Sequence, residues 1–372
     1  MASASSGSLP PVFTFNTLSE IVARARDRLE PQVWDYLCGG SASETTLLRN
    51  RLALDSLALR PRVLRNVRDV DCSAQVLGVS LRMPVMLSPI GALQMFDPDG
   101  SLASARAAAA FGTAAFVGVL GHPALEIVAA RSGGPQFFQL YVRGDKSWIR
   151  GGVDRVRASG YRALCLTVDT ARYSPRDRDL VNRFAPATAV DRPDVSDVLG
   201  RDGDDHQAAT DWDLLAWIRD IAGMPICIKG VMTGEDARQA VDAGMSAVYV
   251  SNHGGRQLDQ GEATIDVLPE IVDAVGSRAD VIVDSGFMRG TDVVKALALG
   301  AQGVAIGELQ GLALAAGGSA AVVRAFELLE MEIKTSMALV GAASIPDLKP
   351  SMIATARPVR LPTATSAFPL LP

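Results

Sequence analysis

Eight short apolar runs recur along this chain, separated by longer amphipathic segments that are rich in alanine. A short apolar run bounded by such segments is typical of a buried parallel strand, and the segments between the runs are typical of crossover helices. The pattern predicts strands at residues 84–88, 113–117, 137–141, 163–169, 226–230, 247–252, 281–286 and 303–307.

Four of these runs begin with apolar residues and end in polar ones, with the sequences TVD, IKG, VSNH and VDSG. In a (β/α)8 barrel, the active site lies at the carboxyl ends of the strands. A doubly wound open sheet is the alternative, but such a sheet concentrates its ligand at one switch point, whereas here polar ends recur on successive strands. We therefore predict an α/β protein with a TIM barrel and a site at its carboxyl face.

Further elements are expected on both sides of the barrel pattern. Residues 12–80 are predicted to form an N-terminal helical cap, in which Thr17 caps the first helix and Glu20 completes a capping box. Residues 319–340 are predicted to form a C-terminal helix.

These elements give one predicted domain at residues 17–345, preceded by a flexible N-terminus at 1–16 and followed by a loose Pro-rich tail at 346–372. The acidic segment at 185–210 is too long for an ordinary strand-to-helix loop. We expect it to be a mobile lid or insert over the active face.

Composition narrows the class of protein. Apolar residues make up 48% of the 372 residues, which suits a large core, and the net charge of -5 with scattered arginines argues against a nucleic-acid partner. Four widely spaced cysteines indicate neither disulfides nor a metal site, and favour a reducing compartment. Since the chain shows neither a signal-peptide pattern nor an apolar run of membrane-spanning length, we expect a cytoplasmic protein with no membrane attachment.

The densest polar cluster is SNHGGRQLD, residues 251–259, directly after the sixth predicted strand. His253 would stand at the barrel mouth, where an imidazole can take a proton near neutral pH, and Arg256 could bind a carboxylate. Gly254 and Gly255 would let the backbone approach a flat ligand. An isolated histidine is more often structural, but this one is among only three and stands beside Asn, Gly and Arg, so we predict a catalytic base.

Two more polar residues end neighbouring strands. Asp169 ends the fourth strand, where a carboxylate could orient the imidazole, or could merely cap the following turn. Lys229 ends the fifth strand, where a buried ammonium needs an electron-rich partner such as a reduced flavin or a phosphate. A Schiff-base lysine is the alternative, but no pyridoxal-type context accompanies it.

The cluster at 251–259, together with FFQLYV, LTVDT, IKGV and DSGFMRGTDVVKALALGA, resembles the signature of the FMN-dependent 2-hydroxy acid oxidase and dehydrogenase family. The motifs follow in order from about Thr17 to Lys334. The resemblance implies FMN as cofactor and oxidation of an (S)-2-hydroxy acid to the 2-oxo acid, with dioxygen or another electron acceptor. It also implies a homo-oligomer, with a tetramer as the expected form.

The resemblance further implies roles for residues at the substrate end of the site. Tyr36 and Tyr141 match two active-site tyrosines, for which packing in the core is the alternative. Arg176 and Arg256 match the pair of arginines that hold the substrate carboxylate, although Arg176 could instead be a solvated side chain among its charged neighbours.

A larger set is implied to contact the flavin. It comprises the segment after the first strand, the residues at the polar edge of the isoalloxazine ring, and a cradle for the phosphate after the seventh and eighth strands. The residues are Pro89, Ile90, Gly91, Gln139, Thr167, Lys229, Ser251, Asp284, Ser285, Gly286, Arg289 and Gly307.

The phosphate end departs from the family pattern. Met288 and Glu308 stand where the family commonly has arginines, and a carboxylate repels a phosphate. Four explanations are open. Arg289 binds the phosphate in place of the missing arginines, FMN binds weakly, the cofactor is a different flavin, or the Glu308 side chain points away from the phosphate. This departure motivates an alternative function, a binding or regulatory barrel without productive FMN binding. A flavin isomerase of the isoprenoid type is disfavoured, because two carboxylate-binding arginines suit an acid substrate.

Two further positions bear on substrate and acceptor. Leu120 stands where some family oxidases have a tryptophan, which predicts room for a larger or aromatic, mandelate-like side chain, unless the space is merely repacked. At position 91 this chain has glycine, which resembles mandelate dehydrogenase, whereas the oxidases of the family mostly have alanine there. This difference slightly favours an electron acceptor other than dioxygen.

Overall fold

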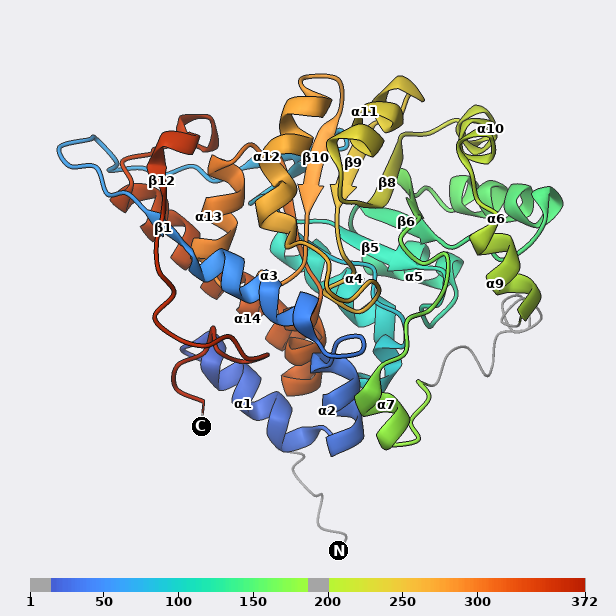
Figure 1. The fold of residues 1–372 in the computed structure, drawn as a ribbon, viewed down its shortest axis with the longest axis horizontal. Coiled ribbons are helices and arrows are strands. Elements are labelled where there is room, and N and C mark those ends of the chain that lie inside the picture. The colour runs from blue at the N-terminus through green and yellow to red at the C-terminus, as the bar shows by residue number, and fades with distance from the viewer. Residues whose placement is uncertain (1–14, 187–200, 372) are drawn as a thin grey trace, which may run out of the picture.

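The computed structural model describes residues 15–186 and 201–371. Eight parallel strands form a closed barrel in which each strand pairs with its neighbours in the sequence, and the last pairs with the first (Figure 1). The strands are β4 (Val85–Leu87), β5 (Ala115–Gly118), β6 (Gln136–Leu140), β7 (Ala163–Thr167), β8 (Ile226–Val231), β9 (Ala247–Val250), β10 (Asp280–Val283) and β11 (Gly303–Ile306). They are the eight predicted runs, with ends shifted by a few residues, so the TIM-barrel prediction is confirmed.

Complete burial explains why the strands read as unbroken apolar runs. Every residue of β5, β6, β7 and β9 is buried, because one face of each strand fills the barrel and the other packs against the surrounding helices. Helices surround the barrel (Figure 1). The helices that follow β4, the first strand of the barrel, are the short 3-10 helix η1 (Leu93–Met95) and α4 (Gly100–Phe111), α5 (Leu125–Ser132), α6 (Lys146–Ala158), α7 (Asp177–Val181), α9 (Arg201–Ala208), α10 (Trp212–Ala222), α11 (Gly234–Asp242), α12 (Thr264–Val275), α13 (Gly290–Ala298) and α14 (Glu308–Leu339).

The N-terminal cap is helical only in its first part, in α1 (Leu18–Arg28), α2 (Pro31–Cys38) and α3 (Thr45–Asp55). The Thr17 hydroxyl caps α1 by accepting a hydrogen bond from the backbone N–H of Glu20 at 3.2 Å. The reciprocal bond of the predicted capping box differs, because the Glu20 carboxylate accepts from the backbone N–H of Asn16 at 2.8 Å.

The predicted helical character of residues 56–80 is wrong. The chain forms the short strand β1 (Leu57–Leu59) and a hairpin of β2 (Ala74–Val76) and β3 (Val79–Leu81). Leu77 and Gly78 form its two-residue turn, and both have positive φ, as the turns that join twisted strands require. Buried side chains of this hairpin share one apolar cluster with residues inside the barrel, so the hairpin closes the barrel at the end opposite the predicted site.

The C-terminal part confirms one expectation and corrects another. Helix α14 is interrupted at Gly317 and Gly318, so the predicted helix at 319–340 is its second half. This helix is long and apolar enough to span a membrane by length and composition, which we did not expect, but it packs against α1, α4 and α13 as a core helix does.

The C-terminal segment is not loose where we predicted a tail. It contains the short helices η2 (Ile345–Asp347) and η3 (Pro350–Met352), and β12 (Ile353–Thr355) pairs with β1. Phe368 near its end is only 2% exposed. An unpaired strand edge and an apolar ring both gain from contact with the protein, which fixes the segment to the barrel.

The predicted insert at 185–210 is described in part, since residues 187–200 lie outside the described residues, as do 1–14 of the predicted flexible N-terminus. The end of the insert forms α9. Gln207 at this end accepts a hydrogen bond from the backbone N–H of Val142 at 2.7 Å and donates one to the carbonyl of Thr167 at 2.9 Å. These bonds attach this part of the insert to the carboxyl ends of β6 and β7.

Candidate active site

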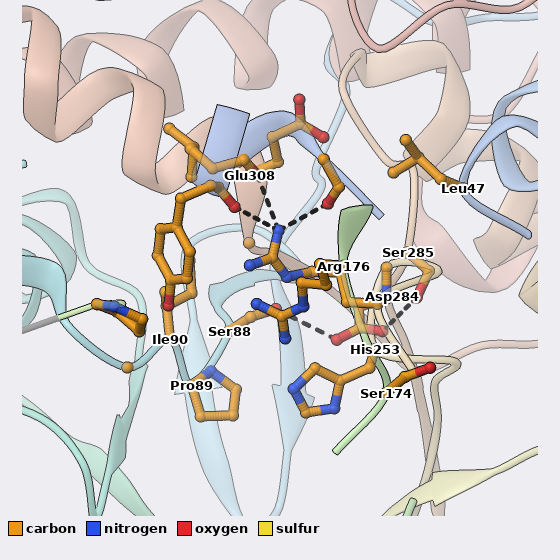
Figure 2. A pocket seen from close by; sticks show the side chains of 18 of the residues that line it. Leu47, Ser88, Pro89, Ile90, Ser174, Arg176, His253, Asp284, Ser285 and Glu308 are labelled. Carbon is orange, nitrogen blue, oxygen red and sulfur yellow. Dashed lines mark hydrogen bonds between the residues drawn. The ribbon is translucent and has the colours of Figure 1, made fainter. Parts of the chain in front are cut away.

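A cavity of about 600 Å³ lies at the carboxyl ends of the barrel strands. Its wall is formed by α2 and α3, by the loops after the strands and by part of the C-terminal segment. Figure 2 shows side chains from both sides of it, with Glu308 at the upper end of the view and Pro89 and His253 at the lower end. The polar strand ends predicted from sequence therefore converge on one site.

An unusual backbone conformation brings His253 to this cavity. His253 follows β9 and has a φ of 60°, and Gly254 and Gly255 after it also have positive φ. Such a conformation is rare for a residue with a side chain. A Cβ on Gly255 would lie 2.3 Å from the backbone nitrogen of Leu47, so only glycine fits where α3 crosses this loop.

His253 and Asp169 form the pair that the sequence predicted. The imidazole Nδ1 lies 3.1 and 3.2 Å from the two carboxylate oxygens of Asp169, while Nε2 lies 3.5 Å from the hydroxyl of Tyr141. Burial lowers the pKa of His253, and Asp169 offsets this only in part. Burial alone would raise the pKa of Asp169, but the charges of His253 and Lys229 lower it overall. A neutral imidazole held by an ionised carboxylate can act as a general base at Nε2.

Arg176 and Arg256 both border the cavity beside this pair. The Nη1 of Arg256 donates to the carbonyls of Tyr36 at 2.6 Å and Gly39 at 2.8 Å, and the Nη1 of Arg176 lies 3.8 Å from the carboxylate of Asp179. Burial, and after it the charge of Arg256, lowers the pKa of Arg176. Two partly buried guanidinium groups that lack a closely bound carboxylate among the described residues form a site for an anion.

Tyr36 and Tyr141 are buried but not merely core residues, since both also border the cavity. The ring of Tyr36 has the guanidinium of Arg256 at 5.0 Å and that of Arg176 at 5.9 Å from its centroid. Burial raises the pKa of Tyr141 well above its ordinary value, so its hydroxyl stays protonated.

Lys229 is a buried cation at the base of the cavity. Its ammonium donates to the Ser251 hydroxyl at 2.8 Å and lies 3.7 Å from the Asp284 carboxylate. Burial alone would lower the pKa of Lys229, but Asp284 and Asp169 raise it overall. A charged ammonium is no nucleophile, which disfavours the Schiff-base alternative and suits an electron-rich ligand.

The remaining residues of the predicted ring site lie on the wall or directly behind it. Pro89, Ile90 and Gly91 border the cavity after β4, as does Gln139, whose amide donates to the hydroxyl of Thr167 at 3.0 Å. Thr167, Ser251 and Asp169 support the wall residues rather than form the wall. An extended apolar backbone, an amide and a buried ammonium fit the ring of a flavin.

The other end of the cavity corrects one prediction. Ser285, Gly286, Met288 and Gly307 border it, but Arg289 does not. Arg289 precedes α13 and forms a bidentate ion pair with Glu332 of α14, at 2.5 and 3.1 Å, so it does not replace the missing phosphate-binding arginines.

Two charged groups on the cavity wall were not predicted from the sequence. Arg143 is buried, pairs with Asp204 and donates to the hydroxyl of Tyr173 at 2.6 Å. Arg51 of α3 pairs with Asp292 and Asp55. The position of Arg143, directly after the FQLYV run, could have indicated the first group, whereas nothing in the sequence near Arg51 indicates the second.

Comparison with known proteins agrees with this geometry. Residues 25–355 match the family described as FMN-dependent dehydrogenase. An L-lactate oxidase from a Nostoc species is 38% identical over 90% of this chain and 97% of its own length, and glycolate oxidase from Spinacia oleracea is 38% identical over 91% and 95%.

Among solved structures, a mandelate oxidase with (S)-4-hydroxymandelic acid matches with a TM-score of 0.86 and 36% identity, over 93% of this chain and 100% of that chain. A soluble mutant of the membrane-associated (S)-mandelate dehydrogenase from Pseudomonas putida matches with a TM-score of 0.86 and 32% identity, over 91% and 99%. The chain belongs to the family of FMN-dependent 2-hydroxy acid oxidases and dehydrogenases, and it is an oxidoreductase with FMN as its cofactor.

Proposed function

We propose that this enzyme oxidises (S)-2-hydroxy acids with an aromatic or otherwise large side chain to the corresponding 2-oxo acids. The observation that carries the chemistry is the His253–Asp169 pair beside two arginines to which no carboxylate of residues 15–186 and 201–371 is closely bound. The feature that favours a large side chain is Leu120 on the cavity wall, because leucine is smaller than the tryptophan that some family oxidases have at this position. Mandelate oxidase, which resembles the chain closely in structure, is consistent with that choice.

The residues divide the reaction between them. Arg176 and Arg256 bind the substrate carboxylate, which places the CH–OH group near Tyr141 and His253. His253 accepts one proton from that group at Nε2, and Asp169 stabilises the imidazolium that results. FMN, when bound, would supply the acceptor for the two electrons and the remaining proton, with dioxygen or another acceptor as the final oxidant. Lys229, Gln139 and the segment at 89–91 would hold its ring, and the charge of Lys229 favours the electron-rich form of a ligand.

No feature of the catalytic end favours the alternative of a binding or regulatory barrel. A protein that only bound ligand would need neither the oriented imidazole nor the ionised carboxylate behind it.

The proposal is tested by measuring kcat/KM for glycolate, L-lactate and (S)-mandelate, with oxygen uptake and with an artificial dye as alternative acceptors. We expect (S)-mandelate to exceed glycolate by about tenfold or more, since filling an apolar pocket is worth that much. Leu120→Trp should lower kcat/KM for (S)-mandelate by about tenfold and leave glycolate nearly unchanged. Leu120→Met, which conserves volume, is the matched control. If glycolate is the best substrate of the native enzyme, the proposed substrate class is wrong.

A further inference from the structure

The carboxyl ends of β10 and β11, the seventh and eighth strands of the barrel, are where this fold commonly binds a phosphate group, using the loops and a helix N-terminus. Here the cavity is bordered by residues 285–288 after β10 and by Gly307 and Glu308 at the start of α14. The cations around this end decide whether it suits a phosphate.

Arg51 is a cation on the wall at this end, where it donates to the carbonyl of Gly286 at 3.2 Å, and it is already paired. Its guanidinium binds Asp292 at 2.8 and 2.9 Å and Asp55 at 2.7 Å. Asp292 also accepts from the backbone N–H groups of Met288 and Arg289. The hydrogen bonds and charges of Asp292 and Asp55 outweigh burial and raise the pKa of Arg51. A phosphate would have to compete with two carboxylates for this arginine.

Other cations near this end are also engaged or directed elsewhere. Arg289 is held by Glu332, and the ammonium of Lys295 donates to the carbonyl of Leu54 at 2.8 Å. Arg357 and Arg360 are exposed and border a separate cavity. Within residues 15–186 and 201–371, no cation without a partner therefore borders this end of the main cavity.

Glu308 adds an acidic group instead. Its Oε1 atom is buried and has no hydrogen-bond partner among the described residues, although the side chain borders the cavity. Burial raises the pKa of Glu308 to about 8, although a hydrogen bond with the Cys38 side chain and the charges of Arg256 and Arg178 oppose this rise. A protonated carboxyl can both donate and accept a hydrogen bond, so it can bind a hydroxyl, whereas an ionised one repels a phosphate.

From this arrangement we propose that the enzyme gains little affinity from the phosphate of its cofactor, and that its site also accepts riboflavin, a flavin whose side chain ends in a hydroxyl, within about tenfold of FMN. Two free arginines on a phosphate would separate the two flavins by about a hundredfold or more, because each charge-assisted hydrogen bond is strong. The backbone N–H groups at the start of α14 explain why a preference for FMN of up to about tenfold remains.

The test is a competition experiment on the purified holoenzyme. The protein is equilibrated with an equimolar excess of FMN and riboflavin, freed of unbound flavin, and its bound flavins are separated by chromatography. We expect riboflavin to make up about a tenth or more of the bound flavin. A smaller share would refute the proposal. The readout does not depend on which hydroxy acid is oxidised, so it is independent of the proposed substrate class.

A positive charge added at this end of the cavity should restore a strong preference for FMN over riboflavin. Met288→Arg is expected to lower the share of riboflavin by about tenfold or more, because it adds an arginine on the cavity wall. Met331→Arg adds the same charge at a side chain that is 56% exposed on α14 and should leave the share unchanged. Equal shares in the two variants would show that the phosphate does not approach Met288, and the proposal would then be wrong.

Discussion

The two ends of the cavity differ in how their charges are compensated. At the catalytic end, no carboxylate of the described residues lies closer to Arg176 than 3.8 Å, and Arg256 donates to main-chain carbonyls. At the other end, Arg51 is held by two carboxylates, and Glu308 presents an oxygen without a partner. One barrel mouth thus contains an anion site that is ready for a ligand and a second region whose cations are already neutralised. Carboxylate substrates and the cofactor's phosphate should therefore depend very differently on arginine.

The largest loss is expected when the base at the catalytic end is removed. His253→Ala should lower the rate of anaerobic flavin reduction by about a thousandfold and leave the bound-flavin spectrum in place, since general base catalysis contributes that much. His206→Ala, at an exposed position on α9, is the control. Reduction at the native rate in His253→Ala would exclude this residue as the base.

The protonation of His253 also determines how kcat/KM depends on pH. Because burial lowers the pKa of His253 below its ordinary value of 6.5, the neutral form is present above that lowered pKa and is lost as the pH falls through it. We expect kcat/KM of the native enzyme to rise with pH on a limb below 6.5 and then to level off. A limb centred above 6.5 would contradict this assignment.

Removing one of the two arginines proposed to bind the substrate carboxylate should cost less activity. Arg176→Met is expected to lower kcat/KM by about a hundredfold, mainly through KM, because one of two charged contacts to the carboxylate is lost. Arg172→Met, which removes a 67% exposed arginine from the same loop, should change it by less than about twofold. Similar losses in both variants would mean a general effect of charge and not a specific carboxylate site.

The sequence pattern was sufficient to predict the features that depend on the repeated strands and helices of the barrel. The eight strands read as buried runs because both of their faces are covered, and the residues at their ends, such as His253, Asp169 and Lys229, meet because strand ends must meet in a closed barrel. The same reasoning failed for the β2–β3 hairpin, whose short strands resemble any other weakly patterned segment.

The direction in which a side chain points could not be predicted from the sequence either. Arg289 stands one position after Met288, and sequence alone placed it at the phosphate end. The start of α13 instead directs it to Glu332, which is 43 positions away along the chain. Arg51 reaches the cavity wall because α3 packs against the loop that follows β10, where its guanidinium donates to the carbonyl of Gly286 at 3.2 Å, a contact that no local pattern reports.

The smallest effect expected is a pH dependence confined to the phosphate end. Because Glu308 has a pKa of about 8, its carboxyl is neutral at pH 7 and charged at pH 9, whereas the second ionisation of a phosphate, near pH 6, is nearly complete at pH 7. The preference of the native enzyme for FMN over riboflavin should therefore fall by up to about tenfold between about pH 7 and about pH 9, as ionised Glu308 repels the phosphate. Glu308→Gln keeps the shape of the side chain without its charge, so its preference should stay constant over the same range. Parallel curves for the native and Glu308→Gln proteins would show that this carboxyl does not face the phosphate, and the contrast between the two ends would then rest on Arg51 and its partners alone.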